Sequence, residues 1–436
     1  MAKYTKSDII RLVEEEDVEF IRLQFVDLYG QLKNMAVTTS QLNKVLENKC
    51  MFDGAAIDGF SEKRNPELFL APDLDTFAIF PWRPQSGKVA RFICNVMNAD
   101  GTPFEGDSRY VLQKVLDQAN EMGYSINVGP ECRFYLFDLD ENGEPTTNTS
   151  EKAGYFDIGP IDAGENARRE MVLYLEDMGF EIESSYHEEE AAHHGIDFKC
   201  DEPIRTADNI ITFKLVVRNV AKRHGVHATF MPKPKYGVDG SGMHLSLSLS
   251  KDGKNIFMNE DNDSQKVSED AYHFMAGIME HIEGITLINN PIVNSYKRLV
   301  PGYGAPVNVT CSTTDRSAII RMTSIGGYGT RMELRTPDGA SNPYLVLALC
   351  LAAGLDGIKR KVQSSVEIDS DIVEDKKKLL PTTLEDAVKA FTKDEFIQGI
   401  LGTHISEKYI EAKKKEWNTY CEQVTRWEVD MYLNRI

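Results

Sequence analysis

Alternating and helical spacings divide the first hundred residues into one short helix followed by several strands. Apolar residues between positions 9 and 13 follow helical spacing and predict a helix over 5–16, with Thr5 as its N-cap. Residues 20–30, FIRLQFVDLYG, alternate and predict a strand that runs into a turn. The runs LKNMAV, FAIFPW and VARFICNVMN predict further strands up to residue 98. This part of the chain is therefore expected to form a small β-rich domain.

A cluster of turn-forming residues, Asn98 to Pro103, follows these strands and predicts a domain boundary, with domains at 1–103 and 104–436. Helices and strands alternate irregularly after the boundary, so we expect an α+β or α/β core, and residues 383–434 form a helix-rich tail. The periodicity predicts helices at 108–122, 163–178, 208–223, 268–283 and 342–360, and strands near 129–137 and 243–250.

The strand GPECRFYLF, residues 129–137, carries an unusual pair of charges. Residues two apart on a strand share a face, so Glu131 and Arg133 are expected to point the same way. A carboxylate and a guanidinium are thus directed together into a part of the protein that its neighbours predict to be buried.

Composition narrows the range of partners and compartments. The 436 residues contain 49 Lys and Arg against 68 Asp and Glu, a formal net charge of −19, which argues against nucleic acid and anionic membranes as partners. No apolar run is long enough to span a membrane, and the charged N-terminus lacks the features of a signal peptide, so we expect a cytoplasmic protein. The 7 cysteines are scattered without a CxxC motif and are expected to be reduced packing residues.

Two polar segments allow both a functional and a structural interpretation. HEEEAAHH, residues 187–194, offers metal ligands in His187, Glu188, His193 and His194, but an exposed acidic loop is the commoner explanation. GVDGSGMH, residues 237–244, could present backbone N–H groups to an anion, but a tight turn is the more frequent role of such glycines.

The arginines near residue 333 form a third candidate site. Arg331, Glu333 and Arg335 alternate within one predicted strand and share a face. Such a face can bind carboxylates or phosphates, or it can form a structural ladder of ion pairs, and the two interpretations have about equal weight.

Taken together, these segments closely resemble glutamine synthetase of the bacterial type I, in its short form without an adenylylation loop. The resemblance runs in order through FIRLQFVDLYG, GTPFEGDSR, GPEC, GIDFK, HATFMPKP, GSGMH, NSYKRLVPGY and NPYLVLALCLAAGLDGIK, and it covers nearly the whole chain. It implies an N-terminal β-grasp-like domain and a larger catalytic-type domain, in which helices pack on a curved antiparallel sheet. It also implies a homo-oligomer, a dodecamer of two hexameric rings with active sites between subunits.

The reaction implied by the resemblance uses ATP to phosphorylate the side-chain carboxylate of glutamate, after which ammonia displaces phosphate. Two Mg²⁺ or Mn²⁺ ions assist, the first held by residues that match Glu131, His244 and Glu333. The second would be held by three glutamates, of which only Glu188 is present, because Arg133 and Gly195 stand at the other two positions. One metal site is therefore expected to be retained and the second lost.

The remaining positions of the family's active site are partly matched. Gly304 stands where the family has a flap glutamate, whereas Asp53 matches the aspartate that assists deprotonation of ammonia. The matching substrate-binding residues are Gly240, Arg298, Arg316 and Arg335, with Arg316 also a catalytic position, and the matching ATP-binding residues are Ser248, Arg321 and Arg331.

These departures lead to a hypothesis about the altered site and to two about function. Arg133 is expected to occupy the position of the second ion and pair with Glu188, which keeps the pocket near neutrality; the alternative is that Arg133 turns out to solvent. We expect a nucleotide- or glutamate-binding pseudoenzyme that forms little or no glutamine and acts in nitrogen metabolism by assembly or regulation, alone or with an active glutamine synthetase paralogue. The alternative is an active ATP-dependent carboxylate–amine ligase, a glutamine synthetase or γ-glutamyl-amine ligase, with an altered amine substrate.

Overall fold

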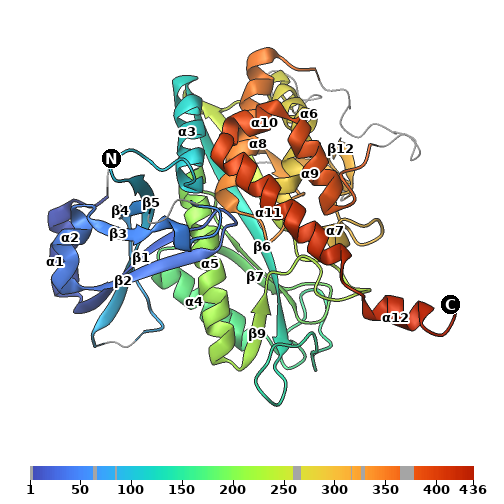
Figure 1. Ribbon diagram of the computed structural model, residues 1–436, viewed down its shortest axis with the longest axis horizontal. Coiled ribbons are helices and arrows are strands. Elements are labelled where there is room, and N and C mark those ends of the chain that lie inside the picture. The colour runs from blue at the N-terminus through green and yellow to red at the C-terminus, as the bar shows by residue number, and fades with distance from the viewer. Residues whose placement is uncertain are drawn as a thin grey trace.

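The computed structural model describes residues 3–61, 66–83, 86–258, 267–315, 317–325, 329–363 and 378–436. A small sheet with its helices lies to one side of a larger sheet that is covered by helices (Figure 1). Each sheet has its own apolar cluster, as the expectation of two domains requires, although Phe104 packs with the smaller cluster and Val26 and Leu28 with the larger one. The boundary at residue 103 itself stays a prediction.

The N-terminal sheet has five strands around a parallel central pair. β1 and β5 are parallel, whereas β2 is antiparallel to β1, β4 to β5, and the edge strand β3 to β4. The predicted first helix is confirmed as α1 (Lys6–Glu15), which begins with a capping box between Thr5 and Asp8. The strand order is β2 (Leu32–Thr38), β1 (Val18–Val26), β5 (Lys88–Asn98), β4 (Glu67–Ile79) and β3 (Cys50–Asp53).

The second sheet has nine strands and is antiparallel except for β12 and β13. Its centre is β6, a long strand in which buried and partly exposed residues alternate as far as Arg133. The main path is β12 (Asn308–Ser312), β13 (Ala318–Ile325), β14 (Gly329–Leu334), β10 (Met243–Lys251), β6 (Tyr124–Asp138), β8 (His193–Phe198) and β7 (Ile182–His187), with β11 (Lys254–Asn255) beside β10 and β9 (Val226–Thr229) beside β6.

The predicted helices all form, but two are longer than their periodicity indicated. α5 begins at Pro203 because proline suits the first turn of a helix, and α6 continues to Asn289 in the apolar core. The helices of the larger domain are α3 (Ser108–Glu121), α4 (Glu165–Asp177), α5 (Pro203–Arg223), α6 (Glu269–Asn289), α7 (Ser295–Arg298), α8 (Pro343–Arg360), α9 (Leu384–Lys393), α10 (Glu395–Leu401), α11 (Thr403–Cys421) and α12 (Arg426–Tyr432), while α2 (Leu42–Leu46) belongs to the smaller one.

Helix α8 is apolar on all sides and buried along nearly its whole length, as expected of a central core helix. It packs against α6 and α3 beneath the sheet, and it begins at Asn342, which caps the backbone N–H of Tyr344. In the described part of the chain, no helix combines the length and apolarity needed to cross a membrane.

Candidate active site

Strand register brings Glu131, His244 and Glu333 together at the centre of the large sheet. β10 lies between β6 and β14, with His244 opposite Glu131 and Ser246 opposite Glu333. His244 Nδ1 is 3.2 Å from Glu333 Oε1 and 3.6 Å from Glu131 Oε2. The three side chains offer ligand atoms that all lie within 4.8 Å of one another. Two carboxylates and an imidazole at this spacing fit a single Mg²⁺ or Mn²⁺ ion.

Glu333 is the member of this trio, which we call the acid–histidine cluster, that also contacts two arginines. Its Oε1 accepts a 2.6 Å bond from Arg335 Nη1, and its Oε2 is 3.6 Å from Arg321 Nη1. Burial raises the pKa of Glu333, but His244 and the two arginines outweigh burial and lower that pKa to about 2. The carboxylate is therefore ionised and available to a cation at any physiological pH.

Arg133 lies beside the cluster and is turned inward. Its guanidinium contacts Glu188 through Nε, lies 2.9 Å from Asp197 Oδ1 and 3.4 Å from Glu131 Oε2, and covers the ring of Tyr186 at 5.2 Å. The side chain is only 13% exposed. The predicted internal pair with Glu188 is confirmed, and the alternative of a solvent-facing Arg133 is wrong.

The charged form of Arg133 is strongly stabilised in this position. Burial opposes the charge, but Asp197, Tyr186, Glu188 and Glu131 together outweigh burial and raise the pKa of Arg133 above its ordinary value. A permanently protonated guanidinium has no lone pair to offer a metal and repels a divalent ion. The residues at this position therefore do not fit a second metal site.

Gly195 gives the Arg133 side chain the room that it occupies. The two residues face each other across β6 and β8, and a Cβ atom at Gly195 would lie 3.2 Å from Arg133 Nη1 and 3.1 Å from Tyr186 Cζ. Even one added carbon would crowd both side chains, and a glutamate could not fit without moving them. The two departures from the family pattern, Arg133 and Gly195, therefore depend on each other: the arginine fills the space that the glycine leaves.

Asp197 belongs to the same arrangement, and sequence reasoning missed it. It lies opposite Glu131 on β8 and is also held by a 2.8 Å bond from the Ser184 hydroxyl. Asp197 follows Gly195 by two residues and therefore lies on the same face of β8 as Gly195. This spacing was the signal in the sequence that could have pointed to Asp197. We call Arg133 with Glu188, Asp197 and Tyr186 the arginine cluster.

The HEEEAAHH segment is packed into the sheet, so its interpretation as an exposed acidic loop is wrong for the histidines. His187, His193 and His194 are all buried, because the segment ends β7 and begins β8. His193 stacks on Tyr135, with the two ring centroids 4.3 Å apart, and its Nε2 lies 3.2 Å from the Ser241 hydroxyl. These contacts give His193 a packing role.

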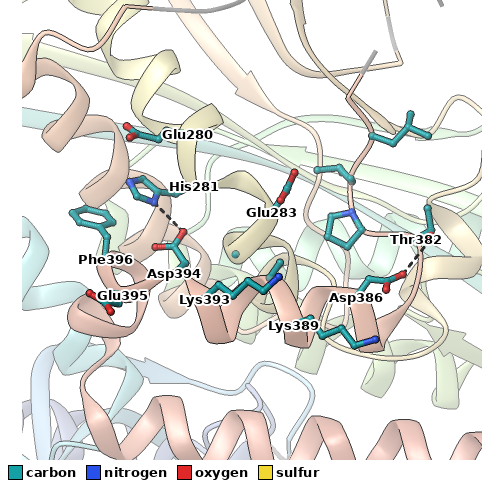
Figure 2. A pocket seen from close by; sticks show the side chains of 15 residues that line it. Glu280, His281, Glu283, Thr382, Asp386, Lys389, Lys393, Asp394, Glu395 and Phe396 are labelled. Carbon is teal, nitrogen blue, oxygen red and sulfur yellow. Dashed lines mark hydrogen bonds and ion pairs between the residues drawn. The ribbon is translucent and has the colours of Figure 1, made fainter. Parts of the chain in front are cut away.

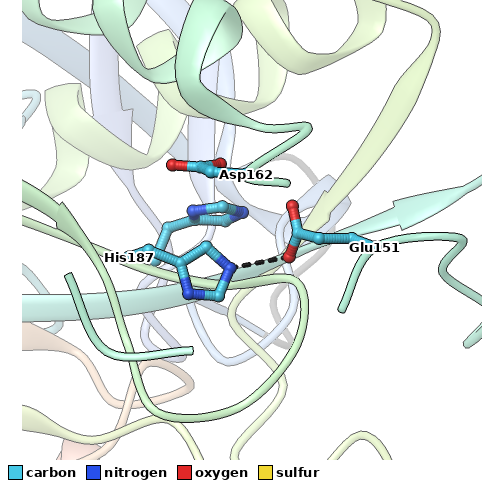
Figure 3. Close-up of side chains that lie close together, drawn as sticks. Glu151, Asp162 and His187 are labelled. Carbon is cyan, nitrogen blue, oxygen red and sulfur yellow. Dashed lines mark hydrogen bonds and ion pairs between the residues drawn. The ribbon is translucent and has the colours of Figure 1, made fainter. Parts of the chain in front are cut away.

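The other two histidines meet Glu151 and Asp162 in a second buried group (Figure 3). His187 Nε2 lies 2.6 Å from Glu151 Oε1, and its Nδ1 lies 2.7 Å from the Glu188 carbonyl. Glu151 and Asp162 also accept backbone N–H bonds from Ala192, Ala163 and Gly164. The group therefore ties the loop between β6 and α4 to the end of β7.

This second group is better described as an ion network than as a metal site. Arg168 Nη1 is 2.8 Å from Asp162 and 2.9 Å from Nδ1 of His194, which must accept because arginine can only donate. The ring proton of neutral His194 then sits on Nε2, where a metal would need a lone pair. Both ring nitrogens of His187 face oxygen acceptors, which suits the protonated ring, and bonding to Glu151 raises the pKa of His187 in spite of burial. With Arg168, a protonated His187 would balance the two carboxylates.

Arg298 is buried below the glycine-rich segment, beside Gly240 and Gly242. It donates to the carbonyls of Thr336 and Arg335 at 2.9 and 3.0 Å. A Cβ at Gly242 would lie 2.7 Å from Arg298 Nη2 and 2.9 Å from His244 Nε2, and one at Gly240 would meet Arg298 as well. Glycine is therefore required at both positions so that the backbone can pack closely against Arg298 and His244. The interpretation of the segment as a simple turn did not predict this packing.

The expected nucleotide-side residues lie along the same sheet. Arg331 Nε donates to the Thr323 hydroxyl at 3.3 Å, and Ser248 lies on β10 opposite Asn127. The Arg-Glu-Arg face therefore contains one tight ion pair, between Arg335 and Glu333, while Arg331 has a hydroxyl partner. Arg316 lies outside the described residues.

Two further candidates lie in loops or in the other domain. Gly304 has a φ of +61° and open space around its Cβ position. Asp53 ends β3 and accepts a 2.9 Å bond from the Ala55 N–H. Within the described residues, no hydrogen bond or ion pair joins Asp53 to the acid–histidine cluster.

A large open pocket lies elsewhere, between α6, α9 and α10 (Figure 2). It has a volume of about 790 Å³, and its wall includes His281, which pairs with Asp394 at 2.9 Å and stacks on Phe396. Its charged residues are of both signs, and none of the predicted site residues lines it.

Comparison with known proteins agrees with this geometry. The glutamine synthetase catalytic domain matches residues 105–432, and the glutamine synthetase beta-Grasp domain matches residues 17–99. The chain belongs to the glutamine synthetase family. Its relatives include glutamine synthetases of Clostridium saccharobutylicum, 54% identical over 443 residues and 100% of both chains, and of Staphylococcus aureus strain MW2, 48% identical over 441 residues and 99% of both.

Solved structures of similar proteins have the same fold. A GmaS/ADP complex is 31% identical, with a TM-score of 0.88 over 98% of this chain and 99% of that one. The glutamine synthetase of Plasmodium falciparum, solved by cryo-electron microscopy, is 23% identical with a TM-score of 0.88 over 99% of each chain. Members of the glutamine synthetase family use ATP and a divalent metal, and the acid–histidine cluster is a possible site for that metal.

Proposed function

We propose that this glutamine synthetase family member is an active ATP-dependent carboxylate–amine ligase that joins the side chain of glutamate to an amine. The observation that carries the proposal is the acid–histidine cluster, in which three ligand atoms within 4.8 Å suit one divalent cation. High identity to proteins named glutamine synthetase over their full length favours this activity over the expectation of an inactive paralogue.

The bound cation would supply charge stabilisation for phosphoryl transfer from ATP. The chain's own groups would hold and orient the reactants: Arg335 lies against the acid–histidine cluster, and Arg298 fixes the backbone of residues 335 and 336 behind it. The nucleotide would lie toward Ser248, Arg321 and Arg331, the positions that match the family's ATP-binding residues. Arg316 remains part of the proposed substrate site.

The arginine cluster supports a modified second half of the reaction. In place of a second metal ion, Arg133 supplies one fixed positive charge next to the substrate position. Its partner Tyr186 contacts Phe156, which stacks on Tyr155, and these two side chains are 60% and 54% exposed. Exposed aromatic faces suit an organic ammonium group. We therefore propose an amine larger than ammonia as the preferred substrate, with Gly304 leaving the entrance open.

Asp53 ends β3 of the N-terminal sheet, and the family resemblance places each active site between this sheet of one subunit and the larger domain of the next, so Asp53 would serve a neighbouring subunit. This supports a homo-oligomer, and we propose the dodecamer of two hexameric rings that the family resemblance implies.

The direct test is phosphate release from ATP and glutamate, with Mg²⁺ or Mn²⁺, across ammonia, methylamine, ethylamine and ethanolamine. We expect amine-dependent release with at least one organic amine and formation of the matching γ-glutamyl amide, detected by mass spectrometry. ATP binding without turnover with any amine would instead favour the second candidate, a regulatory paralogue, which the replacement of two metal ligands by Arg133 and Gly195 supports. Mixing with an active glutamine synthetase would then test for mixed oligomers.

A further inference from the structure

A cationic pocket lies where the N-terminal sheet meets α5. It has a volume of about 330 Å³, and its wall is formed by β1, β2, the segment after β4, one face of α5 and residues 339–340. Four cations line it: Arg22, Arg83, Lys214 and Arg218. No aspartate or glutamate is among the described residues of the wall, although the chain as a whole carries a net charge of −19. Such a concentration of one charge sign, opposite to that of the protein, is not expected from chance surface composition.

Lys214 is the best indicator that the pocket is built for a ligand. The residue is 8% exposed, yet within the described residues its ammonium group has no hydrogen bond or ion pair, and it lies 6.0 Å from the centroid of the Phe230 ring. A buried lysine without a partner is costly, because the ammonium group loses its hydration without compensation. Because Lys214 is one of the residues that line the pocket, an anion bound there would lie close to this charge.

In the described part of the chain, the other cations of the wall, Arg22, Arg83 and Arg218, form no ion pair either. Arg218 lies one turn after Lys214 on α5 and covers the same Phe230 ring at 5.4 Å. Arg22 donates to Asn34 at 2.9 Å, a neutral partner, and stands beside Arg91 in the parallel register of β1 and β5. Arg91 is 4% exposed, and two of its three guanidinium nitrogens have no hydrogen-bond partner.

Polar and aromatic groups complete the wall. Gln31, Asn34 and Asn219 offer amide donors, and Trp82, stacked on Phe80 with a centroid distance of 4.6 Å, closes one side. Amide and guanidinium donors together are suited to oxygen atoms that carry negative charge. A volume of about 330 Å³ admits a small molecule but not a folded segment.

We propose that this cationic pocket binds a small multivalent oxyanion, a phosphate or a dicarboxylate, between the two domains. Lys214 and Arg22 hold the ligand from the two sides, and the anion neutralises charge that the protein itself leaves unpaired. The pocket is separate from the acid–histidine cluster and needs neither ATP nor an amine, so its test does not depend on ligase activity.

The binding is expected to weaken as the pH rises through about 8. Burial lowers the pKa of Lys214 to about 8, while Cys132 on β6 and Asp338 after β14 act in the opposite direction and Arg218 lowers it further. Above this pH the amine is neutral and attracts an anion less, and the arginines of the wall gain no further positive charge. An anion bound below pH 8 holds the proton on Lys214.

The test uses the full-length protein without ATP or amine. Isothermal titration with inorganic phosphate, pyrophosphate and glutarate at low ionic strength distinguishes phosphate from carboxylate ligands. Lys214→Met and Arg22→Gln are each expected to weaken binding by about tenfold or more. Lys222→Met removes an exposed lysine from the same helix outside the pocket and is expected to leave affinity unchanged.

Crystals soaked in selenate locate the ion independently, and we expect anomalous density next to Lys214. Several results would overturn the proposal: no saturable binding of any of the three anions, equal affinities in Lys214→Met, Arg22→Gln and the parent protein, or selenate density only at positions away from Lys214 and Arg22. A Lys214→Met variant that changes oligomeric state without changing anion affinity would instead show that an acidic group of a second copy fills the pocket.

Discussion

Two neighbouring groups on the same sheet, the acid–histidine cluster and the arginine cluster, solve the same electrostatic problem in opposite ways. Glu131, His244 and Glu333 leave an excess of negative charge that a divalent ion can neutralise. A few ångströms away, Glu188 and Asp197 are both paired with Arg133, a cation that is part of the chain. Glu131 contacts both His244 and Arg133, so it lies at the border between the two clusters. The comparison shows that a metal position can be replaced by a side chain without leaving buried charges unpaired.

The strongest way to break this comparison is to restore the missing carboxylates. The double variant Arg133→Glu with Gly195→Glu removes the fixed cation and supplies two acidic ligands beside Glu188. We expect a second Mn²⁺ ion to bind about a thousandfold more tightly than to the parent protein, since repulsion is replaced by attraction worth several kcal/mol. Electron paramagnetic resonance titration counts the bound ions. Arg133→Glu with Gly195→Gln, which adds the same bulk with one carboxylate fewer, is the matched control; one ion per chain in both would contradict the prediction.

Removing a carboxylate from the acid–histidine cluster tests the other half of the comparison, that this cluster binds a divalent cation. Glu333→Gln keeps the shape of the side chain but removes its charge, and we expect ligase turnover to fall by about 10²–10³-fold, because a bound cation contributes several kcal/mol to phosphoryl transfer. Phosphate release with the preferred amine measures the effect. Glu183→Gln, an exposed residue of β7, is expected to be silent. Full activity of Glu333→Gln would mean that the cluster holds no catalytic ion.

Neutralising the arginine cluster should affect stability more than chemistry. Arg133→Met leaves Glu188, Asp197 and Glu131 without their cation, and we expect a loss of about 3 kcal/mol in the free energy of unfolding, typical of a broken buried ion pair. Urea unfolding at pH 7 measures it. Adding Asp197→Asn to this variant should recover part of the loss because one uncompensated charge is removed. If Arg133→Met is as stable as the parent protein, the ion pairs have no structural role.

The smallest expected effect concerns the ring below Arg133. Tyr186→Leu removes a cation–π contact and should lower the free energy of unfolding by about 1 kcal/mol, whereas Tyr186→Phe keeps the ring and should change it little. Thermal unfolding of the two variants gives the difference. Equal losses in both would point to the tyrosine hydroxyl, and not the ring face, as the source of stability.

Much of the fold and part of the site could be predicted from sequence because they depend on local periodicity. Strand alternation placed Glu131 and Arg133 on one face, and capping residues such as Thr5 and Asp107 marked where helices begin. The inward turn of Arg133 was predicted as well. The roles of Asp197 and of the buried histidines were not, because their partners come from other strands and loops.

The sequence by itself determined the family, the order of helices and strands and which side chains share a strand face, since all three follow from motifs and spacings along the chain. Only the tertiary structure decided which faces meet: Gly195 opposite Arg133, Asp197 beside Glu131, and the cations of residues 22, 83 and 214 around one cavity. The physical reason is that strand pairing and domain packing join residues far apart in the chain, and no local period specifies which distant surface will bury a given charge.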